Sequence, residues 1–568
     1  MKTKDLFSIA AAGLLFLSGC ASDEATKTNE RSTEGMTAFV VSDAQPQSRT
    51  TADYDGTGLD FYWTAGDRLW VNNTAATPAL IQDAWNDIND KLTASPVAGG
   101  VQRAAKAKFY FNGAFTANSY PVRYTGKGNT QSDKVTIKAQ QAQTLPNDAS
   151  HVGEDGDCGV ATATKPAGVA QYHFTLNHTA AYATFLPYNT EGEISGAKIT
   201  KIKITADQAI AGTFDFDDSG IKLASRPTAT PANQTIELTL GTAGTGFGFK
   251  QTADIAKNAA TMVVAPGTYA TLKVEYTLYD ADTHNGTTVT RNYTNVTFTA
   301  GLNKKITVDL GIPVYENKYY LWDAQHDAWY GYYQYQPTYD GAPADIHYPQ
   351  SAAADPDRWF NTATNPTVAI NASNSCKDCP NANQMIWYAM KGNPHWDEQK
   401  VWSVMGHLYV GGMWLKKAQK IADDEGTNLT AMKNGYPDPN AGGVMTDWRT
   451  KTEAAFPTFH TVEYPSGTNY GFYNSTIKPI SALASTADYF FLPLIGTFGN
   501  IPGWNGLPPM QVKYYTGYGN YWSSNNIIGQ TGDGLNRGAF NLCFTKNNIY
   551  MGGAGAFYAL YVAPTLFK

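Results

Sequence analysis

The sequence predicts a mainly β protein, and three observations lead to this fold class. Short segments in which apolar and polar residues alternate are clearest between residues 170 and 312. Turn-forming clusters separate these segments, and the chain of 568 residues contains 52 glycines. The same region lacks the apolar repeat of amphipathic helices, which the βαβ units of a parallel sheet need. Antiparallel strands joined by tight turns, as in a β-sandwich, fit this pattern best.

The first 20 residues have the pattern of a lipoprotein signal. Lys2 and Lys4 precede an apolar stretch from Leu6 to Leu17, and the lipobox Leu17-Ser18-Gly19-Cys20 follows. The stretch is shorter than the roughly 20 residues that span a bilayer, which indicates a removable signal. We expect cleavage before Cys20 and lipidation of its thiol, which anchors the chain in the outer membrane. The alternative is a soluble secreted protein with an incidental cysteine.

Residues 21–35 are small and charged without an apolar pattern, which is typical of a tether. Within this tether, Ser22-Asp23-Glu24 resembles the acidic export signal of Bacteroidetes lipoproteins that reach the cell surface. The cell surface is therefore the expected location. The formal net charge of −7 argues against nucleic acid as a partner, because binding nucleic acid needs basic stripes.

The strand pattern begins at Met36, and the chain length suggests about three domains. The segments Leu272–Leu278, Ile236–Leu240 and Ile306–Leu310 place an apolar residue at every second position, which predicts half-buried antiparallel strands. Hydrophobic residues make up 42% of the chain and charged residues 16%, as in ordered globular proteins.

The composition changes after Pro313. Ten of the 13 tryptophans and the only Cys-x-x-Cys pair lie beyond this residue, which indicates a separate domain over residues 313–568. Two helices are predicted within it. One covers Asn381 to Met390, after Pro380, and the other covers Trp414 to Asp424, where apolar residues recur at helical spacing.

Residues 36–312 resemble the fimbrillin or Mfa-like family of Bacteroidales pilus subunits. The resemblance lies in the order of several short motifs: Phe39-Val40-Val41, Arg49-Thr50-Thr51, Trp63, Gly66-Asp67, Tyr120-Pro121, Gln140-Gln141-Ala142-Gln143 and Pro266-Gly267-Thr268-Tyr269. It implies two tandem transthyretin-like β-sandwich domains, over residues 36–182 and 183–312. It also implies assembly with other pilus subunits by β-strand addition, in which a neighbour's segment fills an open place in a sheet.

Residues 313–568 resemble the α+β C-type-lectin-like domain that is often fused to such pilins. The motifs are Asn374–Asn381 with its two cysteines, Trp387-Tyr388, Gly411-Gly412-Met413-Trp414, Tyr521-Trp522-Ser523-Ser524 and Ala539–Phe544. The resemblance implies a ligand-binding domain. Calcium-dependent lectins pair a carboxylate-bearing loop with Trp-Asn-Asp, whereas only Trp504-Asn505-Gly506 stands here. The missing carboxylate removes a calcium ligand, so we do not predict a calcium-bridged sugar site, and we assign no metal ligand to any residue.

Several readings of Cys376 and Cys379 are open. The pair could form half of a zinc site, a redox couple or a local disulfide, or it could be two plain thiols. A disulfide or two plain thiols fits best, because no complete ligand set surrounds the pair. The chain shows no recognisable hydrolase, zinc-protease or phosphate-loop motif, so we predict no catalytic residue, no cofactor and no enzyme. The enzymatic alternative is a formylglycine-generating-enzyme-like protein, since that family shares the lectin-like fold.

Candidate ligand-binding residues cluster in the glycine-rich region after residue 500. Flat rings on loops stack on sugars or anchor protein partners. The candidates are Trp504, Asn505, Tyr514, Tyr515 and Tyr518, with Asp533 and Arg537 as further polar contacts. The alternative is that these rings fill the core of a loop-rich domain and that the two charges are solvated.

Together, these features predict a surface lipoprotein pilin at the tip of a fimbria. Phe557–Pro564 is expected to be the closing strand of the last domain and therefore not free to be donated. Arg49 is a candidate site of proteolytic maturation, because related pilins are trimmed after an arginine; the alternative is an ordinary surface arginine. The expected ligand is a glycan or a protein on a host or bacterial surface. The rival is a free-standing glycan-binding lipoprotein outside any pilus.

Overall fold

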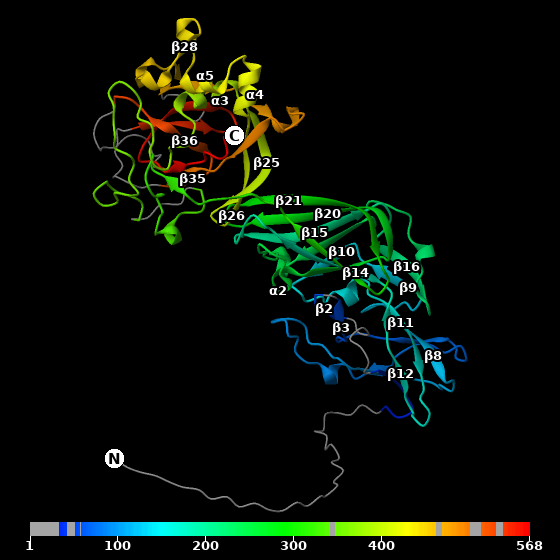
Figure 1. Cartoon of the computed structure of the whole chain (residues 1–568). Helices are drawn as coiled ribbons and strands as arrows, with labels where there is room; N and C mark the ends of the chain where they lie inside the picture. Colours follow the sequence, from blue (N-terminus) through cyan, green and yellow to red (C-terminus); the bar gives the residue numbers. More distant parts are fainter. Residues whose placement is uncertain are drawn as a thin grey trace, which may run out of the picture.

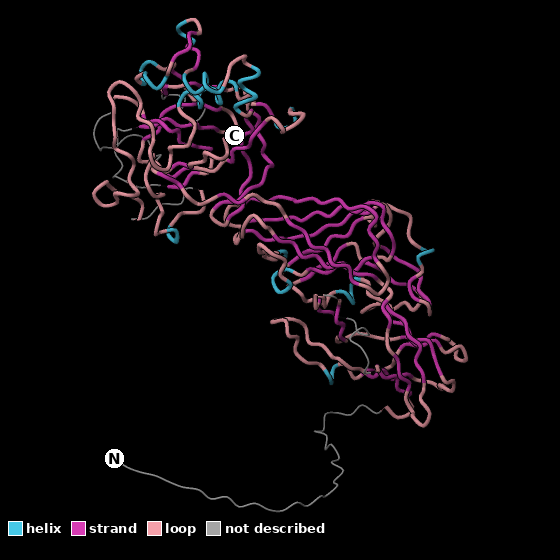
Figure 2. The backbone as a smooth tube through the Cα atoms, viewed as in Figure 1, coloured by secondary structure: helices cyan, strands magenta, loops and turns pink. Residues whose placement is uncertain are grey.

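A computed structural model describes residues 33–42, 51–56, 58–340, 347–461, 468–499, 513–529 and 538–567. Strands predominate, which confirms the mainly β prediction. Three hydrophobic cores follow one another along the molecule (Figure 1). We call the bodies around them the first, second and third units, in chain order. Figure 2 shows that most helical turns lie in the third unit.

The first unit is built on one large sheet. Its strand order is β5 (Leu80–Gln82), β4 (Trp70–Asn72), β8 (Ser119–Tyr124), β11 (Gly159–Thr164), β12 (Tyr172–Phe174), β1 (Thr37–Val41), β7 (Lys108–Phe111) and β6 (Trp85–Asn86), with β13 (Asn177–His178) beside β11. β1 lies inside this sheet, parallel to β12 and antiparallel to β7. Phe39 and Val41 alternate into the core, as the period of a strand requires.

The second unit is a sandwich of antiparallel and mixed sheets. One sheet has the order β10 (Gln140–Gln143), β18 (Thr235–Leu240), β15 (Ala197–Ala206), β20 (Gly267–Asp280) and β21 (Asn285–Phe298). Two smaller sheets have the orders β19 (Ala260–Val264), β14 (Ala181–Tyr188), β22 (Asn303–Asp309), and β17 (Gly220–Ile221), β16 (Gly212–Asp217), β9 (Lys134–Ile137). The alternation predicted for Leu272–Leu278 is found in β20, where every apolar member is buried.

Two buried glutamine side chains join the sheets of the second unit. The amide of Gln141 accepts from Val263 N–H at 3.0 Å and donates to Val263 O at 2.8 Å. Gln143 likewise accepts from Thr261 N–H and donates to Ala259 O, both at 2.8 Å. These side chains satisfy the free edge of β19 in the way a neighbouring strand does, so this edge is closed to strand addition.

A buried polar cluster ties the first two units together. Asp157 Oδ1 accepts from His178 Nδ1 at 2.7 Å and from Tyr182 Oη at 2.5 Å, and all three residues are buried. The second core also takes residues from β2 (Thr51–Tyr54), β3 (Leu59–Tyr62) and the helix α1 (Val152–Asp155). The cores therefore interleave along the chain, and the domain boundary after residue 182 stays a prediction.

The third unit has two main sheets. The first contains β23 (Val314–Tyr315), β25 (His395–Val404), β26 (His407–Lys416) and β33 (Tyr489–Pro493), with β32 (Lys478–Pro479) beside β25. The second has the order β24 (Tyr319–Tyr320), β39 (Leu560–Tyr561), β36 (Gly519–Asn526), β37 (Gly538–Phe544), β38 (Ile549–Gly555) and β31 (Phe472–Asn474). Short ribbons complete it: β27 (Tyr436–Asp438) with β28 (Val444–Thr446), β29 (Thr458–Phe459) with β30 (Asn469–Tyr470), and β34 (Thr497–Gly499) with β35 (Lys513–Tyr515).

Helices are short throughout. The predicted helix after Pro380 is α3 (Ala382–Lys391), and a capping box between Asn381 and Gln384 fixes its start. The helix predicted from Trp414 begins later, as α4 (Ala418–Asp424), because Trp414 and Leu415 belong to β26. The others are α2 (Ile255–Asn258) and α5 (Leu429–Asn434). Within the described residues, no helix combines the length and apolar character that crossing a membrane takes.

The hairpin between β25 and β26 fastens the third unit to the second. Its tip is a two-residue turn in which Met405 (φ 54°) and Gly406 (φ 76°) are both left-handed. Leu408, just past the tip, is fully buried in the second core. Its N–H donates to Asp280 Oδ2 at 2.9 Å, and its carbonyl accepts from Thr283 Oγ1 at 2.7 Å. The two units therefore share buried contacts at this junction.

An ion pair adds to the junction. His407 Nδ1 lies 3.1 Å from Asp280 Oδ2. A Cβ on Gly196 would come within 2.6 Å of both side chains, so glycine at this position makes room for the pair. The hydrogen bond to Asp280 raises the pKa of His407 against the opposing effect of burial. Burial alone would raise the pKa of Asp280, but hydrogen bonds from His407, Leu408 and Thr283 outweigh it and lower the value.

The buried Asp157 cluster predicts a large stability effect. Asp157→Ala leaves His178 Nδ1 and Tyr182 Oη without their acceptor, and we expect a loss of about 3 kcal/mol in the free energy of unfolding. Urea unfolding followed by circular dichroism measures this. The exposed Asp217→Ala is the matched control, with an expected loss of less than about 1 kcal/mol. Equal losses in the two variants would contradict the structural role of the cluster.

The His407–Asp280 pair predicts that stability depends on pH. The contribution of His407 is complete below about pH 6.5 and is lost as pH rises through its raised pKa. The contribution of Asp280 is lost only as pH falls below about 4. We therefore expect the melting temperature of the wild-type chain to fall between pH 6 and pH 8 more than that of His407→Gln. Parallel curves for the two proteins would show that the pair does not stabilise the junction.

Candidate ligand-binding site

A tyrosine-rich loop of the third unit carries the densest group of exposed rings in the described chain. We call residues 326–339 the tyrosine loop. Its five tyrosines are between 37% and 52% exposed: Tyr330, Tyr332, Tyr333, Tyr335 and Tyr339. Single exposed rings are common on protein surfaces. A cluster of large exposed rings, in contrast, often marks a binding site.

The tyrosine loop is held rigidly from below. Trp329 is fully buried and packs edge-on against Phe498, with ring centroids 5.5 Å apart. Asp327 accepts from Trp329 N–H at 3.0 Å and from Tyr333 Oη at 2.7 Å. Arg358, which is 8% exposed, donates to the carbonyls of Ala328 and His347 at 2.7 and 2.8 Å. The backbone that presents the rings is therefore fixed by buried polar contacts.

The exposed rings are themselves ordered by stacking. Tyr330 lies parallel to His326, with centroids 3.9 Å apart, and Tyr335 lies parallel to His347 at 4.0 Å. The guanidinium of Arg358 sits 4.7 Å from the centre of the Tyr332 ring. Rings fixed in this way present flat faces at little further cost in conformational entropy.

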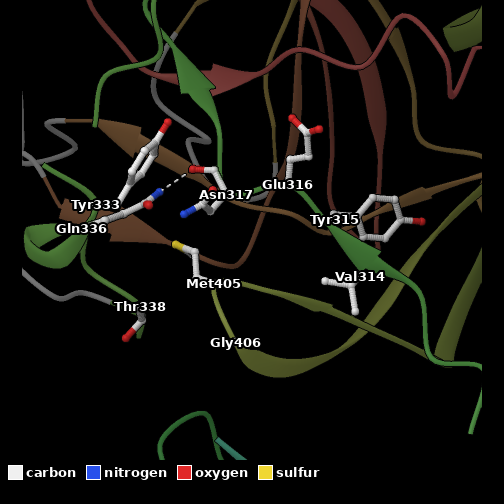
Figure 3. A pocket seen from close by; sticks show the side chains of 9 residues that line it. All are labelled: Val314, Tyr315, Glu316, Asn317, Tyr333, Gln336, Thr338, Met405 and Gly406. Atoms are coloured by element: carbon white, nitrogen blue, oxygen red, sulfur yellow. Dashed lines mark hydrogen bonds between the residues drawn. The ribbon is translucent and has the colours of Figure 1, made fainter. Parts of the chain in front are cut away.

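A cavity of about 340 Å³ opens beside the tyrosine loop. Figure 3 shows Tyr333, Gln336 and Thr338 on one side of it, Val314 and Tyr315 on the other, and Met405 and Gly406 of the hairpin tip below. Its volume lies in the range of small-molecule sites. Walls from three separate segments meet here, at the end of the third unit next to the second.

The polar groups of the cavity are mostly neutral. Gln336 is 7% exposed; its Nε2 donates to Asn317 O at 2.9 Å, whereas its Oε1 is buried without a hydrogen-bond partner among the described residues. Burial raises the pKa of Tyr315 to about 12. Burial, and then the bond to Asp327, raises the pKa of Tyr333. Both tyrosines are therefore neutral phenols at neutral pH.

The predicted ligand-binding residues differ in how far they are buried. Tyr514 is fully buried, with its hydroxyl donating to Ile495 O at 2.9 Å, so its prediction as a ligand contact is wrong and it is a core residue. Tyr515 and Tyr518 are half-buried. Thr516 N–H donates to Asp340 Oδ1 at 2.8 Å, which places this strand end beside the tyrosine loop.

Several predicted site residues lie outside the described residues. These are Cys20, Arg49, Trp504, Asn505, Asp533 and Arg537. The tyrosine loop itself was missed by the sequence analysis. The signal for it was the run from Tyr330 to Tyr339, in which five of the ten residues are tyrosines and the others are glycine, glutamine, proline and threonine. Such a run is too polar for a core strand.

Cys376 and Cys379 are free, buried thiols in this structure and form no disulfide. Burial, and next the neighbouring Cys379, raises the pKa of Cys376 well above the usual thiol value, the opposite of what a redox thiolate needs. Asp323 organises the segment, since its Oδ1 accepts from the N–H groups of Asn374 and Cys376 at 2.7 and 3.2 Å. These two cysteines are structural core residues.

Metal-ligand geometry occurs at one place among the described residues. Asp280, Asp282 and His407 bring their ligand atoms within 4.8 Å of one another. Asp280 already accepts from His407 and from Leu408 N–H, so the hydrogen-bonded junction accounts for this arrangement.

A scan against protein-family models gives no match to this chain, and a search of curated protein sequences also gives none. Solved structures match about half of it. A candidate cell adhesion protein from Bacteroides ovatus is 10% identical with a TM-score of 0.29, covering 49% of this chain and 91% of its own. A candidate cell adhesion protein from Bacteroides uniformis is 14% identical with a TM-score of 0.26, and the match covers 49% of this chain and 95% of that protein. A fimbrial protein from Bacteroides ovatus is 9% identical with a TM-score of 0.22, and the match covers 50% of this chain and 52% of that protein.

The free cysteines allow a direct chemical test. We expect Cys158, Cys376, Cys379 and Cys543 to resist Ellman's reagent in the native state, because all four are buried. Unfolding a Cys20→Ala variant in guanidinium without reductant should then release all four thiols. Two reactive thiols instead of four would reveal a disulfide between Cys376 and Cys379.

Proposed function

We propose that this protein is a cell-surface lipoprotein subunit that caps a pilus-type fibre and presents the third unit to a ligand. The observation that carries the proposal is the position of β39. This strand is antiparallel to β24 on one side and parallel to β36 on the other. A segment paired on both sides cannot be donated to a neighbour unless its own sheet opens.

Side-chain packing holds the same segment. Ala559 and Leu560 are fully buried, and Phe567 packs its ring against Tyr388 and Phe490 at 5.3 and 5.5 Å. Burying a side chain the size of leucine or phenylalanine stabilises the fold by about 1.5–3 kcal/mol each. Pulling this segment out therefore costs several such contacts together with the ladder bonds.

A subunit that caps a fibre must also accept a strand from its neighbour, and the position of β1 supports this part of the proposal. It lies between β7 and β12, and Arg49 follows it in the sequence before β2 begins. Cutting the chain after Arg49 would free β1 to leave, and would open a gap lined by Phe109, Phe111 and Tyr172, all buried. A neighbour's strand with apolar residues in place of Phe39 and Val41 would fill this gap through the same ladder.

The anchoring step follows from Cys20. A lipid on its thiol holds the unassembled chain at the outer membrane, and cleavage after Arg49 would separate the folded units from that lipid. Maturation and release would then be a single event. The glycan-capturing lipoprotein outside any pilus remains the rival, and it predicts permanent attachment to the membrane.

Arg49→Ala is expected to abolish incorporation into fibres, because β1 stays in the sheet. Immunogold electron microscopy of intact cells with an antibody to the third unit, together with immunoblots of sheared fibres, measures this. Wild-type label should lie at fibre ends, and the variant should remain in the membrane fraction at full length. Arg31→Ala, in the tether, is the matched control and should behave as wild type.

Two results would contradict the proposal. Label spread along the length of fibres would show that the subunit extends them. Label restricted to the membrane in the wild-type protein would favour the free-standing lipoprotein.

A further inference from the structure

We propose that the cavity beside the tyrosine loop binds one sugar ring of a neutral oligosaccharide, and that the exposed tyrosines carry the adjoining rings. The inference rests on the proposed ligand-binding role of the third unit and names its ligand class. Three features point to it: an orphaned acceptor in the cavity, the near absence of fixed charge on its walls, and flat aromatic faces at its rim.

The orphaned acceptor is Gln336 Oε1. The other end of this amide is fixed by its bond to Asn317 O, so the side chain cannot rotate to find the oxygen another partner without breaking that bond. In Figure 3 the amide group points toward the middle of the cavity. A buried acceptor left unpaired costs about 1–3 kcal/mol. A sugar hydroxyl entering the cavity would donate to this oxygen and remove that cost.

The remaining walls suit a sugar ring, which has polar edges and apolar C–H faces. Asn317 and Thr338 offer neutral hydrogen-bonding groups, while Val314 and Met405 offer apolar surface. This mixture of an apolar lining with a few placed polar groups is the usual composition of a small-molecule site. Rigid support from Arg358 and Asp327 means that little ordering is needed when a ligand binds.

Charge selects a neutral sugar over an acidic one. Among the described residues that line the cavity, Glu316 alone is charged, and none is a lysine or arginine. Lys318, two residues further along the chain, is paired with Glu316 at 2.9 Å. A sialic acid or sulfated sugar would bring a further negative charge close to Glu316, and no cation among the described lining residues would offset it.

The exposed rings extend the site beyond one sugar. Tyr333 lies on the cavity wall, and Tyr332 and Tyr335 of the same short turn are partly exposed and both pack against His347. Aromatic faces pack well against the C–H face of a sugar ring, and their stacking on His347 and Arg358 keeps them in place. A linear oligosaccharide would therefore continue from the cavity across these rings.

The test is a glycan array that presents neutral and acidic oligosaccharides to the purified full chain, followed by titration calorimetry with the bound ones. We expect neutral oligosaccharides to bind, with Kd on the order of 1 mM or tighter. Gln336→Leu and Tyr335→Ala should each weaken binding about tenfold. Tyr332→Ala should weaken it as well, whereas Tyr470→Ala should not; both tyrosines are 37% exposed in the native chain.

One control accompanies these measurements, and three outcomes would contradict the inference. Gln336→Leu removes a bond to Asn317 as well, so its melting temperature is measured in parallel, and the surface tyrosine variants provide the test if it misfolds. Binding that survives every variant would place the sugar elsewhere. Preference for sialylated or sulfated glycans would contradict the charge argument. A chain that caps fibres but binds only a protein, or no glycan on the array, would end the sugar assignment and leave the capping role standing.

Discussion

The pairing of β39 on both sides is the constraint on which the rest of the third unit depends. Only two residues long, Leu560–Tyr561 joins β24 to β36 and so links the start of the unit to its centre. The neighbouring Ala559 exchanges backbone hydrogen bonds with Phe498 at 2.9 and 3.0 Å, which brings in a further strand. Because Phe498 also packs against Trp329, this segment supports the floor of the tyrosine loop. Fold closure and ligand presentation are therefore linked.

β1 and β39 have opposite properties although both lie inside sheets. β39 is paired with β24 and β36 of its own unit, and Leu560 and the neighbouring Ala559 are fully buried. β1 contributes two buried side chains, Phe39 and Val41, and is joined to the next strand by a segment that contains an arginine. Under the proposed function, a cut after Arg49 would let a neighbour's strand replace β1, whereas β39 would stay paired with β24 and β36 of its own unit. A subunit built in this way would receive a neighbour's strand in place of β1 without donating β39, as the proposed capping role requires.

The sequence predicts those elements whose signal lies in residues that are neighbours in the chain. The strand β20 follows from alternation, and the helix α3 follows from the proline that precedes it. The end of β26 was misplaced, because Trp414 and Leu415 satisfy helical spacing and strand alternation equally over so few residues. Tyr514 and Tyr330 show that the local sequence does not determine which aromatic rings are buried. Both stand in loop-like, tyrosine-rich surroundings, and only the tertiary fold decides that one is buried and the other half exposed.

The hairpin of β25 and β26 brings the cavity and the junction into one element. Met405 and Gly406 form the lower wall of the cavity, while the next two residues, His407 and Leu408, are fixed to the second unit. A ligand that contacts this turn therefore lies within a few residues of the contacts that hold the third unit in place. Force applied to a bound ligand would pass through a short, doubly anchored hairpin into the β20–β21 strands rather than through a flexible linker. The cavity and the contacts that fix the third unit to the second are therefore carried by the same hairpin.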